Sequence, residues 1–133
     1  MSGKKQIAVI GTAEASAEEW DVARTVGMLL AKQQIILISG GKDGVMEASC
    51  QGSREAGGLT IGIVPGTQGN LYLDVIIKTK MNQARNAILV ESADAIIAIG
   101  GGFGTLSEIA YAMKSGIPVY GLMTWNIPGI IIC

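Results

Sequence analysis

A run of glycines follows a strongly apolar segment of the 133-residue sequence. Gly100 to Gly104 has four glycines in five residues, and Thr105 then opens a helical pattern. Glycine lets the backbone approach an anion closely, and a helix N-terminus presents unpaired N–H groups and the positive end of its dipole. A phosphate site is therefore predicted, and a tight turn without a ligand is the alternative. The candidate binding residues are Gly101, Gly102, Phe103, Gly104 and Thr105.

An arginine falls inside the apolar stripe of a helix expected over Lys80 to Ser92. The apolar positions at helical spacing are Met81, Ala84, Ile88 and Leu89. Arg85 lies one turn from Met81 and from Leu89, and an arginine that faces inward needs an anion. Arg85 and Met81 are therefore candidate ligand-binding residues. In the alternative, the stem of Arg85 lies on the core and its guanidinium reaches water or a structural carboxylate.

Glu108 has two interpretations. Thr105-Leu-Ser-Glu108 fits a capping box, in which the carboxylate of Glu108 accepts a hydrogen bond from the N–H of Thr105. A carboxylate one turn after a phosphate loop also suits catalysis. Arg85 and Glu108 are accordingly candidate catalytic residues, and both interpretations of Glu108 stay open.

Two further glycine segments follow expected strands. Gly11-Thr12 ends the first strand and Gly40-Gly41 ends the second. Because the carboxyl ends of parallel strands meet at one edge of a sheet, these four residues are candidates to line the rest of a ligand site, with ordinary loops as the alternative. Neither known phosphate motif is present, because Thr105 replaces the third glycine of GxGxxG and Gly41-Lys42 lacks the flanking residues of a P-loop.

Strands and helices alternate along the sequence. Strands are expected over Gln6 to Ile10, Ile35 to Ser39, Thr60 to Val64, Val75 to Ile77, Ile96 to Ile99 and Pro118 to Leu122. Helices are expected over Ala17 to Lys32, from Val45 to Gly57, over Lys80 to Ser92 and over Leu106 to Lys114. This order predicts an α/β fold with a doubly wound parallel sheet of about six or seven strands and helices on both faces. One domain over residues 1–133 is expected.

The composition excludes several classes of function. Ten basic and eleven acidic residues leave a net charge of −1, so no nucleic-acid partner is expected. The sequence has no histidine and only two cysteines, so no metal site and no histidine base are expected. No apolar run approaches the roughly 18 residues of a membrane span, and the N-terminal residues lack a cleavable signal pattern. A cytoplasmic protein without membrane partners is expected.

The segment Thr124 to Cys133 ends in four apolar residues. Three alternatives stay open for it: an edge strand, part of an oligomer interface, or a sequence that stops short of a final helix. If it drives association, the protein could instead be a structural subunit without a ligand.

Three segments together resemble a known family. Gly100 to Glu108, GGGFGTLSE, resembles the PGGxGTxxE motif of the "lonely guy" cytokinin-activating phosphoribohydrolases and their lysine-decarboxylase-like relatives. Met81 to Asn86 resembles their MxxRK segment, and Ser39 to Met46 is similar to their GGGxxGLMG loop. The resemblance implies a Rossmann-like nucleotide-binding domain, usually dimeric, whose glycine loop takes a 5′-phosphate. It also implies that Arg85 and Glu108 correspond to the family's essential arginine and glutamate.

Departures from the motifs point to one branch of this family. Gly100 replaces the family proline, Asn86 replaces the lysine, no histidine stands beside Met81, and the chain is short. These features resemble the molybdenum cofactor carrier proteins, which have the same core and bind a phosphorylated pterin without known turnover. No lysine suited to pyridoxal phosphate is evident, so lysine decarboxylation is not expected.

Two functions follow from these expectations. In the first, the chain binds a nucleoside monophosphate or a molybdenum cofactor-like molecule through Gly100 to Thr105, requires no cofactor, and forms a homodimer or higher homo-oligomer. In the second, it is a phosphoribohydrolase that cleaves the N-glycosidic bond of a nucleoside 5′-monophosphate.

Overall fold

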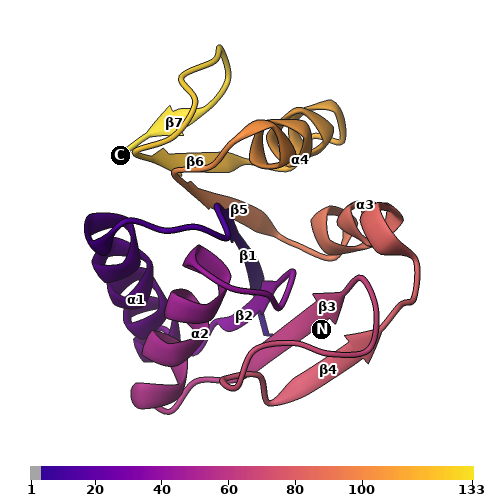
Figure 1. The fold of residues 1–133 in the computed structure, drawn as a ribbon. Coiled ribbons are helices and arrows are strands. Elements are labelled where there is room, and N and C mark those ends of the chain that lie inside the picture. The colour runs from indigo at the N-terminus through magenta and orange to yellow at the C-terminus, as the bar shows by residue number, and fades with distance from the viewer. Residues whose placement is uncertain (1–3) are drawn as a thin grey trace.

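A computed structural model describes residues 4–133 as a seven-stranded, all-parallel sheet flanked by helices (Figure 1). Residues 1–3 of the N-terminal stretch considered for a signal lie outside the described residues. The strands are β1 (Gln6–Gly11), β2 (Ile36–Ser39), β3 (Thr60–Val64), β4 (Val75–Lys78), β5 (Ala95–Ile99), β6 (Val119–Leu122) and β7 (Ile131–Ile132). The helices are α1 (Ala17–Lys32), α2 (Val45–Glu55), α3 (Arg85–Glu91) and α4 (Phe103–Lys114), with a 3₁₀ turn, η1 (Asn82–Ala84).

The strand order β4-β3-β2-β1-β5-β6-β7 reverses direction at β1. β1 pairs in parallel with β2 on one side, where Ala8 lies opposite Ile38, and with β5 on the other, where Ala8 lies opposite Ile96. The doubly wound α/β architecture expected from the sequence is thereby confirmed. In such sheets ligands bind beyond the carboxyl ends of the strands at the reversal, which here lies between β1 and β5.

Helices cover both faces of the sheet, with α1 and α2 on one side and α3 and α4 on the other (Figure 1). The first apolar core includes Leu30 of α1 and Ala48 of α2, and the second includes Leu89 of α3 and Ile109 of α4. Alternate residues of each central strand enter the two cores, which explains why these strands are apolar throughout.

The N-terminus of α1 is capped as the sequence predicts. The hydroxyl of Ser16 accepts a hydrogen bond from the N–H of Glu19 at 3.1 Å, and the Glu19 carboxylate accepts one from the N–H of Ser16 at 2.9 Å. Such a capping box satisfies two otherwise unpaired N–H groups and fixes where the helix begins.

The helix expected over Lys80 to Ser92 is shorter than predicted. Lys80 and Asn82 have positive φ angles of 55° and 51°, and α3 begins only at Arg85. The N–H of Asn82 donates to the carbonyl of Pro65 at 3.1 Å, so the backbone bonds to a distant loop instead of a helical turn. The side chain of Met81 is consequently 48% exposed, and the predicted inward stripe is wrong at this position.

The C-terminal segment forms an edge strand, one of the three alternatives considered for it. β7 pairs in parallel with β6, with Ile131 opposite Tyr120 and Ile132 opposite Gly121. Among residues 4–133, no helix has the length and apolar character needed to cross a membrane.

Candidate functional site

A cavity of about 260 Å³ lies at the carboxyl ends of β1 and β5, where the strand order reverses. Three strand-to-helix loops and the helices α3 and α4 contribute its walls. The lining residues that the sequence singled out are Gly11, Thr12, Gly40, Arg85, Gly102, Gly104, Thr105 and Glu108. Positions spread over nearly 100 residues of the sequence thus meet in the wall of one cavity.

The wall nearest β5 is the N-terminus of α4. This helix begins at Phe103, Gly102 is its N-cap residue, and no side chain caps it. Its first N–H groups therefore lack partners within the helix, and the positive end of the dipole lies at the cavity. The capping-box interpretation of Glu108 is wrong, because the helix begins before Thr105 and Glu108 falls in its second turn.

Glu108 is instead a largely buried carboxyl group in the cavity wall. Burial raises its pKa from 4.5 to about 7, and the nearby Arg85 guanidinium only partly opposes this change. At neutral pH both protonation states of Glu108 are populated, so the group can accept or donate a proton.

Arg85, the first residue of α3, lines the cavity together with Glu108. Burial lowers the pKa of Arg85, and the Glu108 carboxylate partly offsets that effect. In the part of the chain that the structure describes, no ion pair joins the two side chains. The Nε of Arg85 is buried without a hydrogen-bond partner. The cavity therefore holds a cation that is incompletely paired within the protein.

Gly40 makes room for this arginine. A Cβ atom at Gly40 would overlap the Nη1 of Arg85 and lie 2.8 Å from its Cζ. The guanidinium from α3 thus rests on the backbone at the end of β2, which only glycine allows at this distance. The inward-facing interpretation of Arg85 is confirmed, although the predicted helical stripe around it is not.

The loop after β2 is locked to the loop after β1. The N–H of Val45 donates to the carbonyl of Thr12 at 3.0 Å. A Cβ atom at Gly44 would collide with Thr12 and with Ala13, whose carbonyl carbon lies 2.6 Å away. These contacts fix the relative positions of the two loops that form one side of the cavity.

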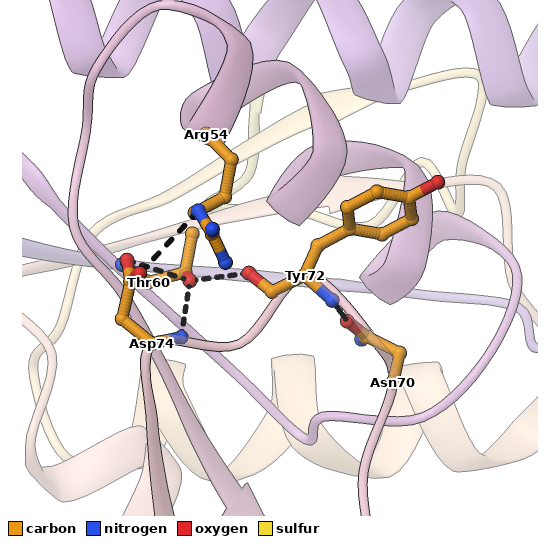
Figure 2. Close-up of polar contacts among 5 residues, drawn as sticks. All are labelled: Arg54, Thr60, Asn70, Tyr72 and Asp74. Carbon is orange, nitrogen blue, oxygen red and sulfur yellow. Dashed lines mark hydrogen bonds and ion pairs between the residues drawn. The ribbon is translucent and has the colours of Figure 1, made fainter.

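A polar network braces the same loop from outside the cavity (Figure 2). The hydroxyl of Thr60 donates to the carbonyl of Tyr72 at 2.6 Å, and the carboxylate of Asp74 accepts from the N–H of Thr60 at 2.9 Å. Arg54 of α2 pairs with Asp74 at 3.3 Å, and the side-chain oxygen of Asn70 accepts from the N–H of Tyr72 at 3.0 Å. The segment from Asn70 to Asp74 is therefore tied to both β3 and α2.

Asn70 connects this network to the loop after β2 through two hydrogen bonds. Its N–H donates to the carbonyl of Gly41 at 2.8 Å, and its side-chain nitrogen donates to the carbonyl of Lys42 at 2.9 Å. The sequence showed only turn residues in this region, and nothing in their spacing indicated that Asn70 reaches back to Gly41.

Four residues singled out in the sequence do not line the cavity. Gly41 packs against Val64 and Leu73, and Gly101 packs against Thr105. Met81 is exposed, while Phe103 is 82% exposed and its ring lies 5.9 Å from that of Trp125.

Other lining residues were missed by the sequence reasoning. They are Val9, Ile10, Ala13, Met46, Gln83, Asn86 and Leu89. Gln83 and Asn86 lie within two residues of Arg85 in the sequence. The replacement of the lysine of the MxxRK segment by Asn86 could have marked Asn86 as a candidate site residue. The others are apolar positions that resemble ordinary core residues.

An α/β domain with this strand order and a cavity at its switch point has a Rossmann-like fold. The chain is a member of the SLOG cluster4 family, whose model matches residues 4–131. The family resemblance drawn from Gly100 to Glu108 is thereby confirmed.

The sequence relatives include a protein without an assigned activity and an enzyme. An uncharacterized protein from Archaeoglobus fulgidus is 47% identical over 119 residues, which cover 88% of this chain and 79% of that protein. A cytokinin riboside 5′-monophosphate phosphoribohydrolase from Arabidopsis thaliana is 34% identical over 96 residues, covering 67% of this chain and 42% of the enzyme. The matched segment therefore spans less than half of that enzyme's length.

Solved structures match nearly the whole chain. The molybdenum cofactor binding protein of Rippkaea orientalis superposes with a TM-score of 0.94 and 35% identity, covering 100% of this chain and 91% of that protein. The molybdenum cofactor carrier protein of Chlamydomonas reinhardtii gives a TM-score of 0.90 and 31% identity, covering 98% and 90%.

Proposed function

We propose that this protein binds a phosphorylated nucleotide-like or pterin-like small molecule, with the phosphate at the N-terminus of α4 and beside Arg85. The observation that carries this proposal is the meeting of two unsatisfied positive groups in one cavity. The uncapped end of α4 and the incompletely paired guanidinium of Arg85 both lie in its wall. Gly102 and Gly104 leave open space there, since no atom outside their immediate neighbours would lie within 4 Å of an added Cβ.

The free energy of binding shows why both the N-terminus of α4 and Arg85 are needed. A helix N-terminus stabilises an anion by about 0.3–2 kcal/mol. Binding at a micromolar dissociation constant needs about 8 kcal/mol. Arg85 and the contacts of the remaining ligand with the cavity must supply the difference. The similarity to two molybdenum cofactor-binding proteins over nearly the full chain favours a pterin as the remaining part of the ligand.

Calorimetric titration of AMP, GMP and molybdenum cofactor tests the proposal. We expect Arg85→Ala to weaken binding by at least about tenfold, because it removes a charge-assisted contact to the phosphate. Arg24→Ala is the matched control, since Arg24 pairs with Glu55 on an exposed surface away from the cavity and also loses one positive charge. Absence of binding by the wild-type protein, or equal loss in both variants, would contradict the proposal.

A second function rests on Glu108. Its carboxyl group, with a pKa of about 7, lies in the same cavity as Arg85. Cleavage of an N-glycosidic bond passes through an oxocarbenium-like state, which a carboxylate at this place could stabilise while Arg85 binds the phosphate. The identity of 34% with a phosphoribohydrolase supports this alternative. Incubation with AMP and GMP should then release ribose 5-phosphate in the wild-type protein and not in Glu108→Gln. Equal release by both proteins would reject this role of Glu108.

Assembly into a homodimer or larger homo-oligomer and a cytoplasmic location remain part of the proposal. Native mass spectrometry of the purified protein measures the oligomer and detects any phosphorylated ligand retained during purification. A monomer without bound ligand would contradict the proposed assembly.

A further inference from the structure

The segment between β6 and β7 binds two carbonyl groups of the glycine loop. The hydroxyl of Thr124 donates to the carbonyl of Gly100 at 2.5 Å. The indole Nε1 of Trp125 donates to the carbonyl of Gly102 at 3.1 Å. Neither side chain lines the cavity, yet both contact the loop that forms its wall.

These hydrogen bonds fix the orientation of two peptide groups. No peptide bond among residues 4–133 is cis, and in a trans peptide the carbonyl and the following N–H point in opposite directions. When Thr124 binds the carbonyl of Gly100, the N–H of Gly101 must therefore point away from Thr124. In the same way, Trp125 orients the N–H of Phe103. A peptide group turned over would present a carbonyl oxygen in place of an N–H, and that oxygen would repel an anion.

The Gly102 carbonyl accepts a second hydrogen bond, from the N–H of Leu106 at 3.0 Å. This bond closes the first turn of α4, so Trp125 and the helix bind the same carbonyl group. The ring of Phe103 lies 5.9 Å from that of Trp125 at an interplanar angle of 31°. The start of α4 and the segment after β6 are therefore joined by a hydrogen bond at Gly102 and an aromatic contact at Phe103.

The C-terminal segment is itself well anchored. The positive φ of Met123, 55°, turns the chain directly after β6. Gly121 provides space for Thr124, because an added Cβ there would lie 2.9 Å from the Thr124 methyl group. The N–H of Cys133 donates to the carbonyl of Gly121 at 2.9 Å, which secures the far end of the segment. Thr124 and Trp125 thus project from a backbone that is attached on both sides.

We propose that Thr124 and Trp125 are positioning residues that hold the backbone of Gly100 and Gly102 in place, so that the N-terminus of α4 at Gly102 and Gly104 stays in the cavity wall and open to an anion. The proposal rests on the proposed function, because it assumes that the phosphate binds at the N-terminus of α4. It assigns to the C-terminal segment a role in ligand affinity that requires no contact with the ligand.

Calorimetry with AMP, GMP and molybdenum cofactor tests the role in affinity. Thr124→Val keeps the shape of the side chain and removes the hydroxyl, and Trp125→Phe keeps a ring and removes the N–H. We expect either change to weaken binding about five- to tenfold, as for loss of one hydrogen bond that orders a binding loop. Thr124→Ser, which retains the hydroxyl, should bind within about twofold of the wild-type protein.

The fluorescence of Trp125 reports on the surroundings of this side chain when a ligand binds. The sequence has two tryptophans, so Trp20→Phe leaves Trp125 as the only indole. Its fluorescence should change on titration with the probe that binds and saturate at the calorimetric dissociation constant. Unchanged affinity in both Thr124→Val and Trp125→Phe, while Arg85→Ala still loses binding, overturns the positioning role and leaves the proposed function standing.

Backbone ¹⁵N relaxation without ligand tests whether the hydrogen bonds from Thr124 and Trp125 order the glycine loop. The order parameters of the Gly101 and Gly102 N–H groups, which precede the first turn of α4, should be about 0.85 in the wild-type protein and fall below about 0.6 in Thr124→Val or Trp125→Phe. Unchanged order parameters and unchanged amide chemical shifts in both variants would overturn the inference. Failure of the wild-type protein to bind any probe would overturn the proposed function and, with it, the role of Thr124 and Trp125 in affinity.

Discussion

The loops after β2 and β5 look alike in sequence and differ in what surrounds them. In the first, glycines are required because other parts of the protein fill the adjacent space. Gly41 lies against Val64 and Leu73, and Gly44 lies against the backbone of Ala13. In the second, Gly101 packs against Thr105, whereas Gly102 and Gly104 face no such atom within 4 Å of an added Cβ. A glycine that packing explains is structural, whereas an exposed glycine beside a cavity leaves room for something outside the chain.

The largest effect should come from Gly44→Ala, which tests the structural side of this contrast. Gly44 has a φ of 65°, and its new Cβ would lie 2.6 Å from the carbonyl carbon of Ala13. We expect the free energy of unfolding to fall by about 3–5 kcal/mol, because strain and a backbone collision combine. Urea denaturation measures it.

Gly66→Ala is the matched control for this change. Gly66 follows β3, does not have a positive φ, and leaves an added Cβ without a neighbour within 4 Å. Its stability should stay within about 0.5 kcal/mol of the wild-type protein. Equal stabilities of Gly44→Ala and Gly66→Ala would show that the loop after β2 can yield, and the contrast between the two loops would be lost.

Gly104→Ala should separate binding from stability. Alanine is favoured over glycine in a helix by about 0.5–1 kcal/mol, and the added Cβ would meet no other part of the protein within 4 Å. The protein should therefore be at least as stable. Affinity for AMP, GMP or molybdenum cofactor should fall by at least about tenfold, since the methyl group occupies the approach of the phosphate. Calorimetry and urea denaturation on the same sample measure both effects, and undiminished affinity would place the ligand elsewhere.

Burial of Glu108 beside the cavity lowers the stability of the folded protein at neutral pH. Its pKa is raised from 4.5 to about 7 in the folded protein, so the folded state binds a proton more tightly than the unfolded chain. The contribution of Glu108 to stability therefore falls as the pH rises from about 4.5 to 7 and is constant above that range. The rise in pKa, which already includes the opposing charge of Arg85, corresponds to a loss of about 3 kcal/mol.

Glu108→Gln should remove this part of the pH dependence. Urea denaturation of both proteins at pH 5 and pH 8 gives the comparison, and the stability difference between the two pH values should be smaller in the variant. The same difference in both proteins would mean that the Glu108 carboxyl group is not desolvated in the folded state.

Local patterns were sufficient to predict the architecture. The Ser16–Glu19 capping box and the apolar run of β2 depend on neighbouring residues, and the structure confirms both. The start of α3 could not be predicted in this way, because the hydrogen bond from Asn82 to Pro65 spans a long loop. Short-range periodicity cannot register a partner so distant in the sequence.

The same limit applies to Glu108 and the start of α4. The sequence favoured Thr105 as the N-cap residue because its hydroxyl can accept a hydrogen bond. In the structure, Trp125 binds the carbonyl of Gly102, and the helix begins immediately after it. The helix thus begins earlier than predicted, at a point where the C-terminal segment contacts the chain. Glu108 therefore lies in the second turn of α4, in the cavity wall.

The smallest effect is expected from Lys42→Ala. This change tests whether the positive charge in the loop after β2 contributes to ligand affinity. Lys42 is exposed and does not line the cavity, although it stands between Gly41 and Gly44. At physiological ionic strength exposed charges are screened over about 8 Å. The affinity for AMP, GMP or molybdenum cofactor should therefore change by less than about twofold in calorimetry at that salt concentration. A loss comparable to that of Arg85→Ala would mean that the loop after β2 contacts the phosphate, and that its glycines serve the ligand as well as the packing.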